Sequence, residues 1–289
     1  MTKTALVLGG GGLLGVSWST GMVAGLRDAG ADVTGADRIV GTSAGSIVGT
    51  QIAQGTPLDE MVEWHHAPRD PDALDLNMEI DLQSTVAIFA RWASYTEMTP
   101  DNCAEIGAMA LAATTVDEDR WVESLGDLVG SDWSEREVVL TAVDAESGAF
   151  QTWTRDSGVG LHRAIASSCS VPGLFPPVSI NGRRYQDGGV RSTTNADLAA
   201  GFDAVLIIAP IGARPDGIDP LSNRLATAEA EMLRAAGAEV ELAFPDEGAQ
   251  EAMGINRMDS SRRGLCADAG REQGRRLAGR ISAWAQAAA

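Results

Sequence analysis

A GTSAG pentapeptide centred on Ser43 is the part of the chain whose residue types and spacing most clearly predict chemistry. An apolar run, residues 36–40, leads into it, and a helix-like run, residues 46–54, follows it. In a nucleophile elbow this pattern forms a sharp strand-to-helix turn, and glycines such as Gly41 and Gly45 let strand and helix pass close together. The pattern also occurs in ordinary turns, but a strand before it and a helix after it favour an exposed nucleophilic hydroxyl.

A glycine-rich loop, residues 9–15, is the second candidate. It separates a predicted buried strand, Thr4–Leu8, from a predicted helix over residues 16–27. A loop in this position presents backbone N–H groups at a helix N-terminus, where anions bind well. The loop can therefore stabilise the oxyanion of an ester-hydrolysis intermediate.

The same loop also matches a dinucleotide-binding pattern. Gly10, Gly12 and Gly15 have the G-x-G-x-x-G spacing. Asp32 and Asp37 lie about 20 residues further on, where an acid that binds ribose is expected. In such a unit the second strand ends near that acid, whereas here it runs into the serine elbow. The sequence therefore disfavours nucleotide binding.

The third candidate is the turn Asp187-Gly188-Gly189, which follows a segment rich in serine and proline, residues 166–178. Taken alone, an Asp-Gly-Gly turn between apolar segments predicts a hairpin turn. Beside an activated serine it gains a second interpretation, because a carboxylate can accept the hydroxyl proton without an intervening imidazole.

The positions of the histidines bear on the type of catalytic base. The chain has three, His65, His66 and His162, and all of them precede Asp187. A triad in the order serine, acid, histidine would need a histidine after the acid. The sequence therefore favours a Ser-Asp dyad over a triad.

Together the three motifs resemble those of the bacterial patatin-like phospholipase family, in the same order and over about residues 4–211. The resemblance implies a three-layer α/β/α sandwich with a mostly parallel central sheet. It implies a lipid acyl hydrolase, a phospholipase A-type esterase, that works through an acyl-enzyme. It implies the following roles: nucleophile Ser43; base Asp187; oxyanion hole Gly10, Gly11 and Gly12; elbow and turn glycines Gly15, Gly41, Gly45, Gly188 and Gly189.

One position departs from the family pattern. Many relatives have a basic residue, usually arginine, where this chain has Leu14. Backbone donors do not depend on that side chain, so catalysis is expected to survive. The departure weakens the prediction of a bound anionic headgroup and leaves simple esters as substrates. A lipid-binding or regulatory protein with little activity, built on the same scaffold, is the alternative function.

Length and composition bear on the number of domains and on the cellular location. With 289 residues and 44% hydrophobic content, we expect a single domain over residues 1–289, with the motifs in 4–211 and a C-terminal extension in 212–289. No basic leader with an apolar stretch and no run of 18 apolar residues is present, so we expect a cytoplasmic protein.

The net charge restricts the binding partners, and the cysteines indicate the state of the thiols. A net charge of −18 argues against nucleic acid and against tight adsorption to anionic membranes. We expect a lipid or other acyl-ester substrate and at most transient contact with a membrane surface; the oligomeric state stays open. Cys103, Cys169 and Cys266 are expected to be free thiols, and no metal or organic cofactor is predicted.

The remaining elements are predicted from periodicity. Residues 56–81 are expected to be irregular and acidic. Helices are expected over residues 82–94, 101–113, 121–128, 219–236 and 260–287, and strands over residues 137–144, 149–154, 203–210 and 238–244. Residues 83–92 form either a helix packed on the core or a cap over the acyl pocket. The arginines of the last helix either face solvent and the protein body or dock to a partner.

Overall fold

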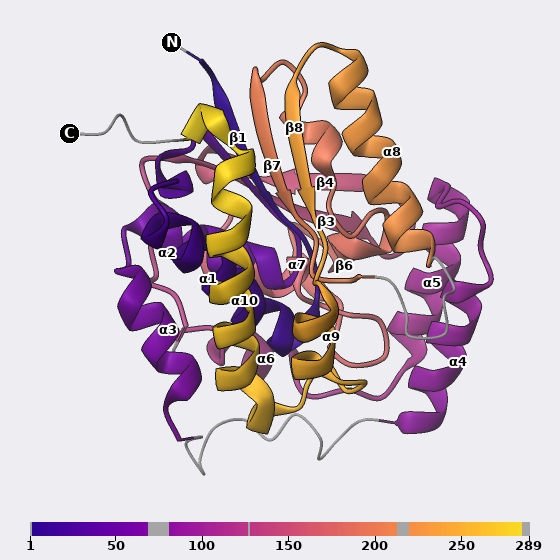
Figure 1. Cartoon of the computed structure of the whole chain (residues 1–289). Coiled ribbons are helices and arrows are strands. Elements are labelled where there is room, and N and C mark those ends of the chain that lie inside the picture. The colour runs from indigo at the N-terminus through magenta and orange to yellow at the C-terminus, as the bar shows by residue number, and fades with distance from the viewer. Residues whose placement is uncertain (1, 69–80, 127, 213–219, 285–289) are drawn as a thin grey trace.

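A sheet of eight strands organises the described part of the chain, which comprises residues 2–68, 81–126, 128–212 and 220–284 of a computed structural model (Figure 1). The strands are β1 Thr4–Leu8, β2 Arg38–Gly41, β3 Glu137–Asp144, β4 Phe150–Trp153, β5 Val178–Ile180, β6 Arg183–Asp187, β7 Ala204–Ile208 and β8 Glu239–Ala243. Their order is β5-β6-β3-β2-β1-β7-β8, and β4 pairs with β3 outside this path.

Five neighbouring strands, β3, β2, β1, β7 and β8, run parallel. At the end of β1, Leu8 is in register with Gly41 of β2 and with Ile208 of β7. The loops that follow these strands therefore meet at one edge of the sheet, where α/β folds place their ligands. The expected mostly parallel sheet is confirmed, with β4, β5 and β6 added in antiparallel orientation.

Helices cover the sheet on both faces. Those of the described residues are α1 Gly12–Asp28, α2 Ala44–Gln54, α3 Leu58–His66, α4 Leu82–Ala93, α5 Pro100–Ala112, α6 Glu118–Glu123, α7 Leu161–Ser168, α8 Leu221–Ala235, α9 Glu247–Met253 and α10 Arg263–Leu277. Among them, none combines the length and the apolar character that crossing a bilayer requires.

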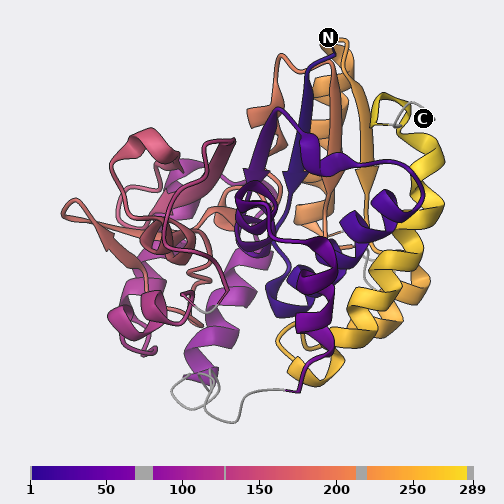
Figure 2. The same cartoon turned by 90° about the vertical axis from the view of Figure 1, so that its left-hand side faces the viewer.

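The alternation of side chains along β1 shows the three layers. Leu6 and Leu8 belong to a core with residues of α1, α2, α7 and α10. Ala5 and Val7 point the other way and pack with residues of α8, while α4 and α5 cover β3 on that face. Turned by 90°, the molecule shows α10 on one side and residues 82–190 gathered on the other (Figure 2). The three-layer α/β/α architecture is confirmed.

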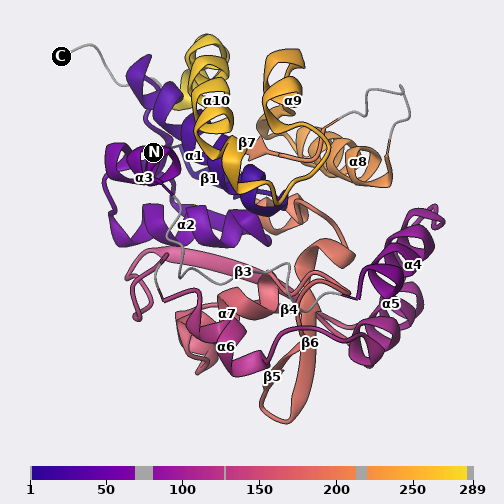
Figure 3. The same ribbon diagram turned by 90° about the horizontal axis from the view of Figure 1, so that it is seen from below.

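The C-terminal extension is packed tightly against the N-terminal part. Helices α1 and α10 lie side by side (Figures 1 and 3). A Cβ atom at Gly21 would lie 1.9 Å from the carbonyl oxygen of Ala267, and one at Gly274 would lie 2.3 Å from that of Met22. Only glycine permits this approach. With β8 in the same sheet, the extension completes the fold instead of standing apart from it.

Some expected boundaries were wrong. Residues 58–66, expected to be irregular, form α3, because Leu58, Met61, Val62 and His65 repeat at helical spacing and are buried on one face. The last helix ends at Leu277, before the expected limit. Strands β5 and β6 and helix α9 were not predicted. Residues 69–80, the remainder of the expected irregular section, lie outside the described part of the chain.

Candidate active site

Ser43 occupies a strained turn between β2 and α2. Its φ of 53° and ψ of −120° are unusual for a residue with a side chain. The C-terminal end of α7 holds this backbone on both sides: the Ser43 N–H donates to Ser168 Oγ at 3.0 Å, and Cys169 Sγ donates to the Ser43 carbonyl at 3.2 Å. Ser46 Oγ donates to the same carbonyl at 2.6 Å. The surroundings therefore stabilise the conformation that an elbow requires.

The glycines of the pentapeptide allow helix and strands to approach. A Cβ atom at Gly45 would lie 1.9 Å from the carbonyl oxygen of Leu8 in β1. One at Gly41 would lie 2.7 Å from the Cα of Ser46. Larger residues at either position would push α2 away from the sheet, so both glycines have the steric role that a nucleophile elbow gives them.

The glycine loop lies directly against the nucleophile. A Cβ atom at Gly10 would lie 3.3 Å from Cβ and 3.8 Å from Oγ of Ser43. On its other side the loop packs on Pro210, which a Cβ atom would approach to 2.5 Å at Gly11 and 3.2 Å at Gly15. The loop is thus held between Pro210 and the elbow, within reach of a carbonyl group bound at Ser43.

The donors in this loop are not equivalent. The N–H of Gly10 donates to the Thr193 carbonyl at 2.8 Å and is therefore occupied. The N–H groups of Gly11 and Gly12 have no acceptor among the described residues, because α1 begins at Gly12, earlier than expected. The N–H of Ala44 is equally without an acceptor there. Ala44 was not predicted from the sequence, because it contributes only a backbone group that any residue could supply.

Asp187 ends β6, and its carboxylate is 2% exposed. Its Oδ1 accepts the N–H of Gly189 at 2.7 Å. Its Oδ2 has no well-aligned hydrogen-bond partner among the described residues, and the neighbouring Ser43 hydroxyl is the side chain that favours its charged form. Catalytic hydrogen bonds are often long or poorly aligned until substrate is bound. The structure therefore brings the predicted nucleophile Ser43 and the predicted base Asp187 together.

Burial raises the pKa of Asp187 to about 7, against the opposing influence of the neighbouring Ser43 hydroxyl and the Gly189 N–H. A carboxylate with an ordinary pKa is a weak base at neutral pH, whereas one with a pKa near 7 is suited to general-base catalysis. The buried position thus gives the carboxylate a basicity closer to that of an imidazole.

The turn after Asp187 is packed against β3. A Cβ atom at Gly188 would lie 2.2 Å from Thr141 Oγ1, and one at Gly189 would lie 2.8 Å from Asp187 Oδ1. Both positions therefore exclude side chains, which explains the two glycines better than a requirement for hairpin geometry. The turn continues into a 3-10 helix, Gly188–Val190, instead of a second hairpin strand.

The three histidines bond elsewhere. His65 Nδ1 lies 3.0 Å from Ser17 Oγ, and burial lowers the pKa of its imidazole to about 3. His66 pairs with Asp268, and His162 contacts the Val129 carbonyl. Within the described residues, none has a hydrogen bond to Ser43 or Asp187.

An apolar cavity of about 280 Å³ opens beside Ser43. Ser43, Ala44 and Gly12 are among the residues that line it. Its walls come from α1, α2, α3 and from α6 with the residues that follow it, and the lining side chains include Ile47, Met61, Trp121, Leu125 and Phe175. The rings of Trp121 and Phe175 stack at a centroid distance of 4.0 Å. Such a cavity suits a hydrocarbon chain whose carbonyl end reaches Ser43.

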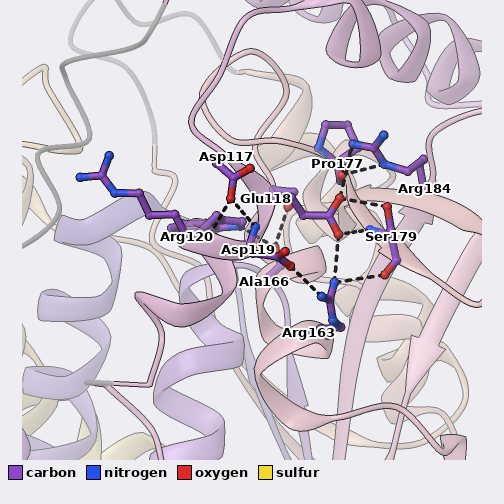
Figure 4. A network of polar contacts seen from close by, with 11 residues as sticks. Asp117, Glu118, Asp119, Arg120, Arg163, Ala166, Pro177, Ser179 and Arg184 are labelled. Atoms are coloured by element: carbon purple, nitrogen blue, oxygen red, sulfur yellow. Dashed lines mark hydrogen bonds and ion pairs between the residues drawn. The ribbon is translucent and has the colours of Figure 1, made fainter.

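The wall formed by α6 is fixed by polar contacts (Figure 4). Glu118 accepts the Ser179 N–H at 2.8 Å and Arg163 at 2.9 Å, so it joins α6 to β5 and α7. Trp121 Nε1 donates to the Ala166 carbonyl at 3.2 Å. A wall held in this way keeps the shape of the cavity.

Helix α4 does not line this cavity. Thr85 donates to the Gly173 carbonyl at 2.8 Å, and Ile88 joins a cluster with α5 and β3. The interpretation of residues 83–92 as a helix packed on the core is therefore correct for the described part of the chain. A second cavity of about 500 Å³, lined by residues 65–68 and 260–268, does not reach Ser43.

The acids of the nucleotide-binding alternative lie at the wrong end of the sheet. Asp37 Oδ2 accepts the N–H of Thr4 at 2.7 Å, and Asp32 caps the short turn at Thr34. Both sites adjoin the amino ends of β1 and β2, opposite the glycine loop. The geometry gives these acids local roles and does not support a ribose site.

Other expectations concern cysteines, metals and arginines. The three cysteines are free and buried. Within the described residues, no cluster of three or more His, Cys, Asp or Glu side chains could hold a metal ion.

The arginines of α10 pair with the body of the protein. Arg271 and Arg275 both bind Asp28, at 2.7 Å each.

Comparisons with known proteins show which family this chain resembles. A family model for patatin-like phospholipases matches residues 6–200. An uncharacterized NTE family protein of Mycobacterium tuberculosis is 27% identical over 208 residues, 72% of this chain and 48% of that protein. A protein of the same description from Mycobacterium bovis matches to the same extent. The chain spans about half the length of these curated relatives.

Solved structures provide more distant likenesses. VipD from Legionella pneumophila is 12% identical, with a TM-score of 0.46 over 97% of this chain and 67% of that chain. The type III effector protein ExoU is 14% identical, with a TM-score of 0.43 over 99% of this chain and 54% of that chain.

Proposed function

Because the chain belongs to the patatin-like phospholipase family, we propose that it hydrolyses carboxylic esters of lipids, with Ser43 as nucleophile and Asp187 as general base. One observation supports this proposal above all. A serine in a strained elbow lies beside a buried carboxylate and lines an apolar cavity. A nucleophile, a base and an acyl site are thereby combined in one place.

In the first half of the reaction, Ser43 Oγ attacks the ester carbonyl carbon while Asp187 accepts the hydroxyl proton. The carbonyl oxygen becomes an oxyanion. We assign its stabilisation to the N–H groups of Gly11, Gly12 and Ala44, and their lack of another acceptor among the described residues supports this assignment. The intermediate then collapses: the C–O bond to the alcohol breaks, and Asp187 returns the proton to the leaving oxygen.

In the second half, water replaces the alcohol. Asp187 accepts a proton from water as the water oxygen attacks the acyl-enzyme carbonyl. Collapse of this second intermediate releases the carboxylic acid, and the proton returns to Ser43. The same carboxylate therefore serves as base and acid in both halves, as its raised pKa allows.

The surroundings of the site suggest how substrate is met. The cavity is apolar and has a volume of about 280 Å³, which favours a hydrocarbon chain, while a net charge of −18 disfavours anionic lipid surfaces. We propose transient contact with neutral lipid and a cytoplasmic location. We also propose that residues 1–289 act as one catalytic unit, because motifs far apart in sequence converge at one edge of the sheet.

Labelling with a fluorophosphonate probe, together with hydrolysis of a lipid extract, tests the proposal. Ser43→Ala is expected to abolish both, because it removes the attacking oxygen. Ser19→Ala is the matched control: Ser19 Oγ is buried without a partner among the described residues, so its removal leaves labelling and stability intact. Label on Ser43→Ala, or a wild-type protein that binds lipid without labelling, would contradict the proposal. The second result favours the alternative of a lipid-binding protein.

A further inference from the structure

Asn195 contacts the residue before Ser43 and the residue after Asp187, the two proposed catalytic residues. It lies on the loop after the Asp-Gly-Gly turn, is fully buried, and has a φ of 49°. Its Nδ2 lies 3.1 Å from Oγ1 of Thr42, the residue before Ser43. The same nitrogen lies 3.3 Å from the carbonyl oxygen of Gly188, the residue after Asp187. We propose that Asn195 is a positioning residue that fixes the nucleophile relative to its base.

The orientation of the Asn195 amide follows from its neighbours. Arg191 can only donate, and it does so to Asn195 Oδ1 at 2.7 Å. The NH2 group must therefore face the opposite way, where Thr42 and Gly188 lie. The carbonyl of Ser192 accepts from this group at 2.6 Å. All polar atoms of the buried amide are satisfied, so it has a single low-energy orientation.

The loop that carries Asn195 is itself held in place. Arg191 pairs with Asp197 at 2.7 Å. Glu229 of α8 accepts Thr194 Oγ1 at 2.6 Å and the Ala196 N–H at 2.8 Å. The residues on both sides of Asn195 are thus hydrogen-bonded to α8, which fixes the position of the amide.

Sheet pairing joins the two strands that carry the proposed catalytic residues only indirectly. Strand β3 lies between β2, which leads to Ser43, and β6, which ends at Asp187. Thr141 of β3 contacts Thr42 Oγ1 at 2.9 Å and packs against Gly188, but it donates at most one hydrogen. Asn195 adds two hydrogens, which its Nδ2 shares among Thr42 Oγ1, the Gly188 carbonyl and the Ser192 carbonyl. A displacement of about 1 Å between reacting groups can cost about 10²-fold in rate, which is why this bridge matters.

The proposal rests on the proposed function and is tested with Asn195→Gly. Glycine adopts a positive φ without strain, so the variant removes the amide and leaves the backbone in place. Asn181→Gly is the matched control: Asn181 has a φ of 52° in the exposed turn between β5 and β6, away from the site. Both proteins are assayed for kcat, KM, fluorophosphonate labelling of Ser43 and melting temperature.

We expect Asn195→Gly to lose about 10²-fold in kcat with KM little changed. Loosening the Asp187 turn also admits water to the carboxylate, so the midpoint of the pH profile should move to lower pH. A purely structural role would lower the melting temperature and leave that midpoint in place. If Asn195→Gly keeps the kcat and pH profile of Asn181→Gly, the positioning role is wrong.

A double-mutant cycle tests the path through Thr42. Thr42→Val keeps the shape of the side chain and removes the hydroxyl that Asn195 contacts. If Asn195 acts through this contact, the double variant loses little more activity than Asn195→Gly alone, whereas additive losses would overturn the proposal. The outcomes are separable from failure of the proposed function, because that failure shows in the wild-type protein and in Asn181→Gly as absent Ser43 labelling.

Discussion

Ser43 and Asp187 are neighbours although the strands that carry them are separated in the sheet by β3. Asp187 is in register with Ala142 of β3, and Gly41 is in register with Leu140 of the same strand. Asp187 and the elbow residue Gly41 thus pair with positions of β3 that are two residues apart. Ser43 and Asp187 come from opposite sides of that strand and meet at its carboxyl end.

Asp187→Asn is expected to reduce kcat/KM by about 10²- to 10⁴-fold, because it removes the general base. The fold should be retained, since an asparagine oxygen can still accept the N–H of Gly189 as Oδ1 does now. Steady-state kinetics and a melting curve on the same protein give both quantities. A folded variant with a near-normal rate would show that Asp187 only shapes the turn.

The pH profile of kcat/KM should follow ionisation of Asp187. The carboxylate must be charged to accept the Ser43 proton, and its pKa is raised to about 7. Activity on a soluble ester is therefore expected to rise with pH, with a midpoint near neutrality, and to level off above it. A rate that falls as pH rises through neutrality would require a protonated catalyst and exclude this assignment.

The same buried carboxylate should reduce the stability of the protein at high pH. Its folded pKa lies above its ordinary value of 3.8, so the folded state holds the proton more tightly than the unfolded state. Stability is therefore greatest below the unfolded pKa and falls as pH rises through about 7, by a few kcal/mol at most. Asp187→Asn, which cannot ionise, should gain stability relative to wild type at about pH 8 but not at about pH 4.

Denaturant unfolding of both proteins at these two pH values measures this difference. Asp156→Asn is a suitable control, because the Asp156 side chain is 94% exposed. A stability gain in Asp187→Asn that is the same at both pH values would contradict a buried carboxylate with a raised pKa.

The three motifs could be predicted from the sequence because each is local. Gly41, Ser43 and Gly45 are defined by a strand before them and a helix after them, and both are visible as apolar patterns. The base was harder to assign, since nothing near Asp187 distinguishes it from a turn residue. Only the lack of a later histidine and the resemblance to a family favoured it. Ser43 and Asp187 meet across the sheet, and their spacing in the sequence does not predict that contact.

The acyl cavity and the bridging amide could not be predicted. Helix α3 was missed because its buried positions are separated by Asp59, Glu60 and Glu63, which make the segment look like a polar loop. Asn195 lies 153 positions from Thr42, and no local pattern connects them. Ala44 acts only through its backbone. The rest of the site thus depends on long-range packing, which a single sequence does not display.

Hydrolysis is expected to be independent of metal ions. The described residues contain no cluster of three or more side chains suited to a metal, and the proposed chemistry requires only a hydroxyl, a carboxylate and backbone donors. Dialysis against EDTA should leave kcat/KM unchanged. Activity that is lost in EDTA and restored by Ca²⁺ or Zn²⁺ would indicate a different mechanism.

Substitution of the histidines distinguishes a dyad from a hidden triad. His66→Gln and His162→Gln are expected to keep kcat/KM, because their side chains bond to Asp268 and to a backbone carbonyl. His65→Gln is the decisive variant, because His65 lines the same cavity as Ser43. It should also keep most of kcat/KM, since the imidazole bonds to Ser17 and not to the nucleophile.

His65→Gln should instead change the response of stability to acid. Burial lowers the pKa of His65 from 6.5 to about 3, so the unfolded state binds a proton that the folded state refuses. This contribution to stability is fully present above about pH 6.5 and is lost as pH falls toward 3. Glutamine does not titrate, so the variant should lose less stability than wild type between these values. Denaturant unfolding across this range measures the effect. A folded His65→Gln protein without activity would instead make His65 part of the catalytic machinery and overturn the dyad.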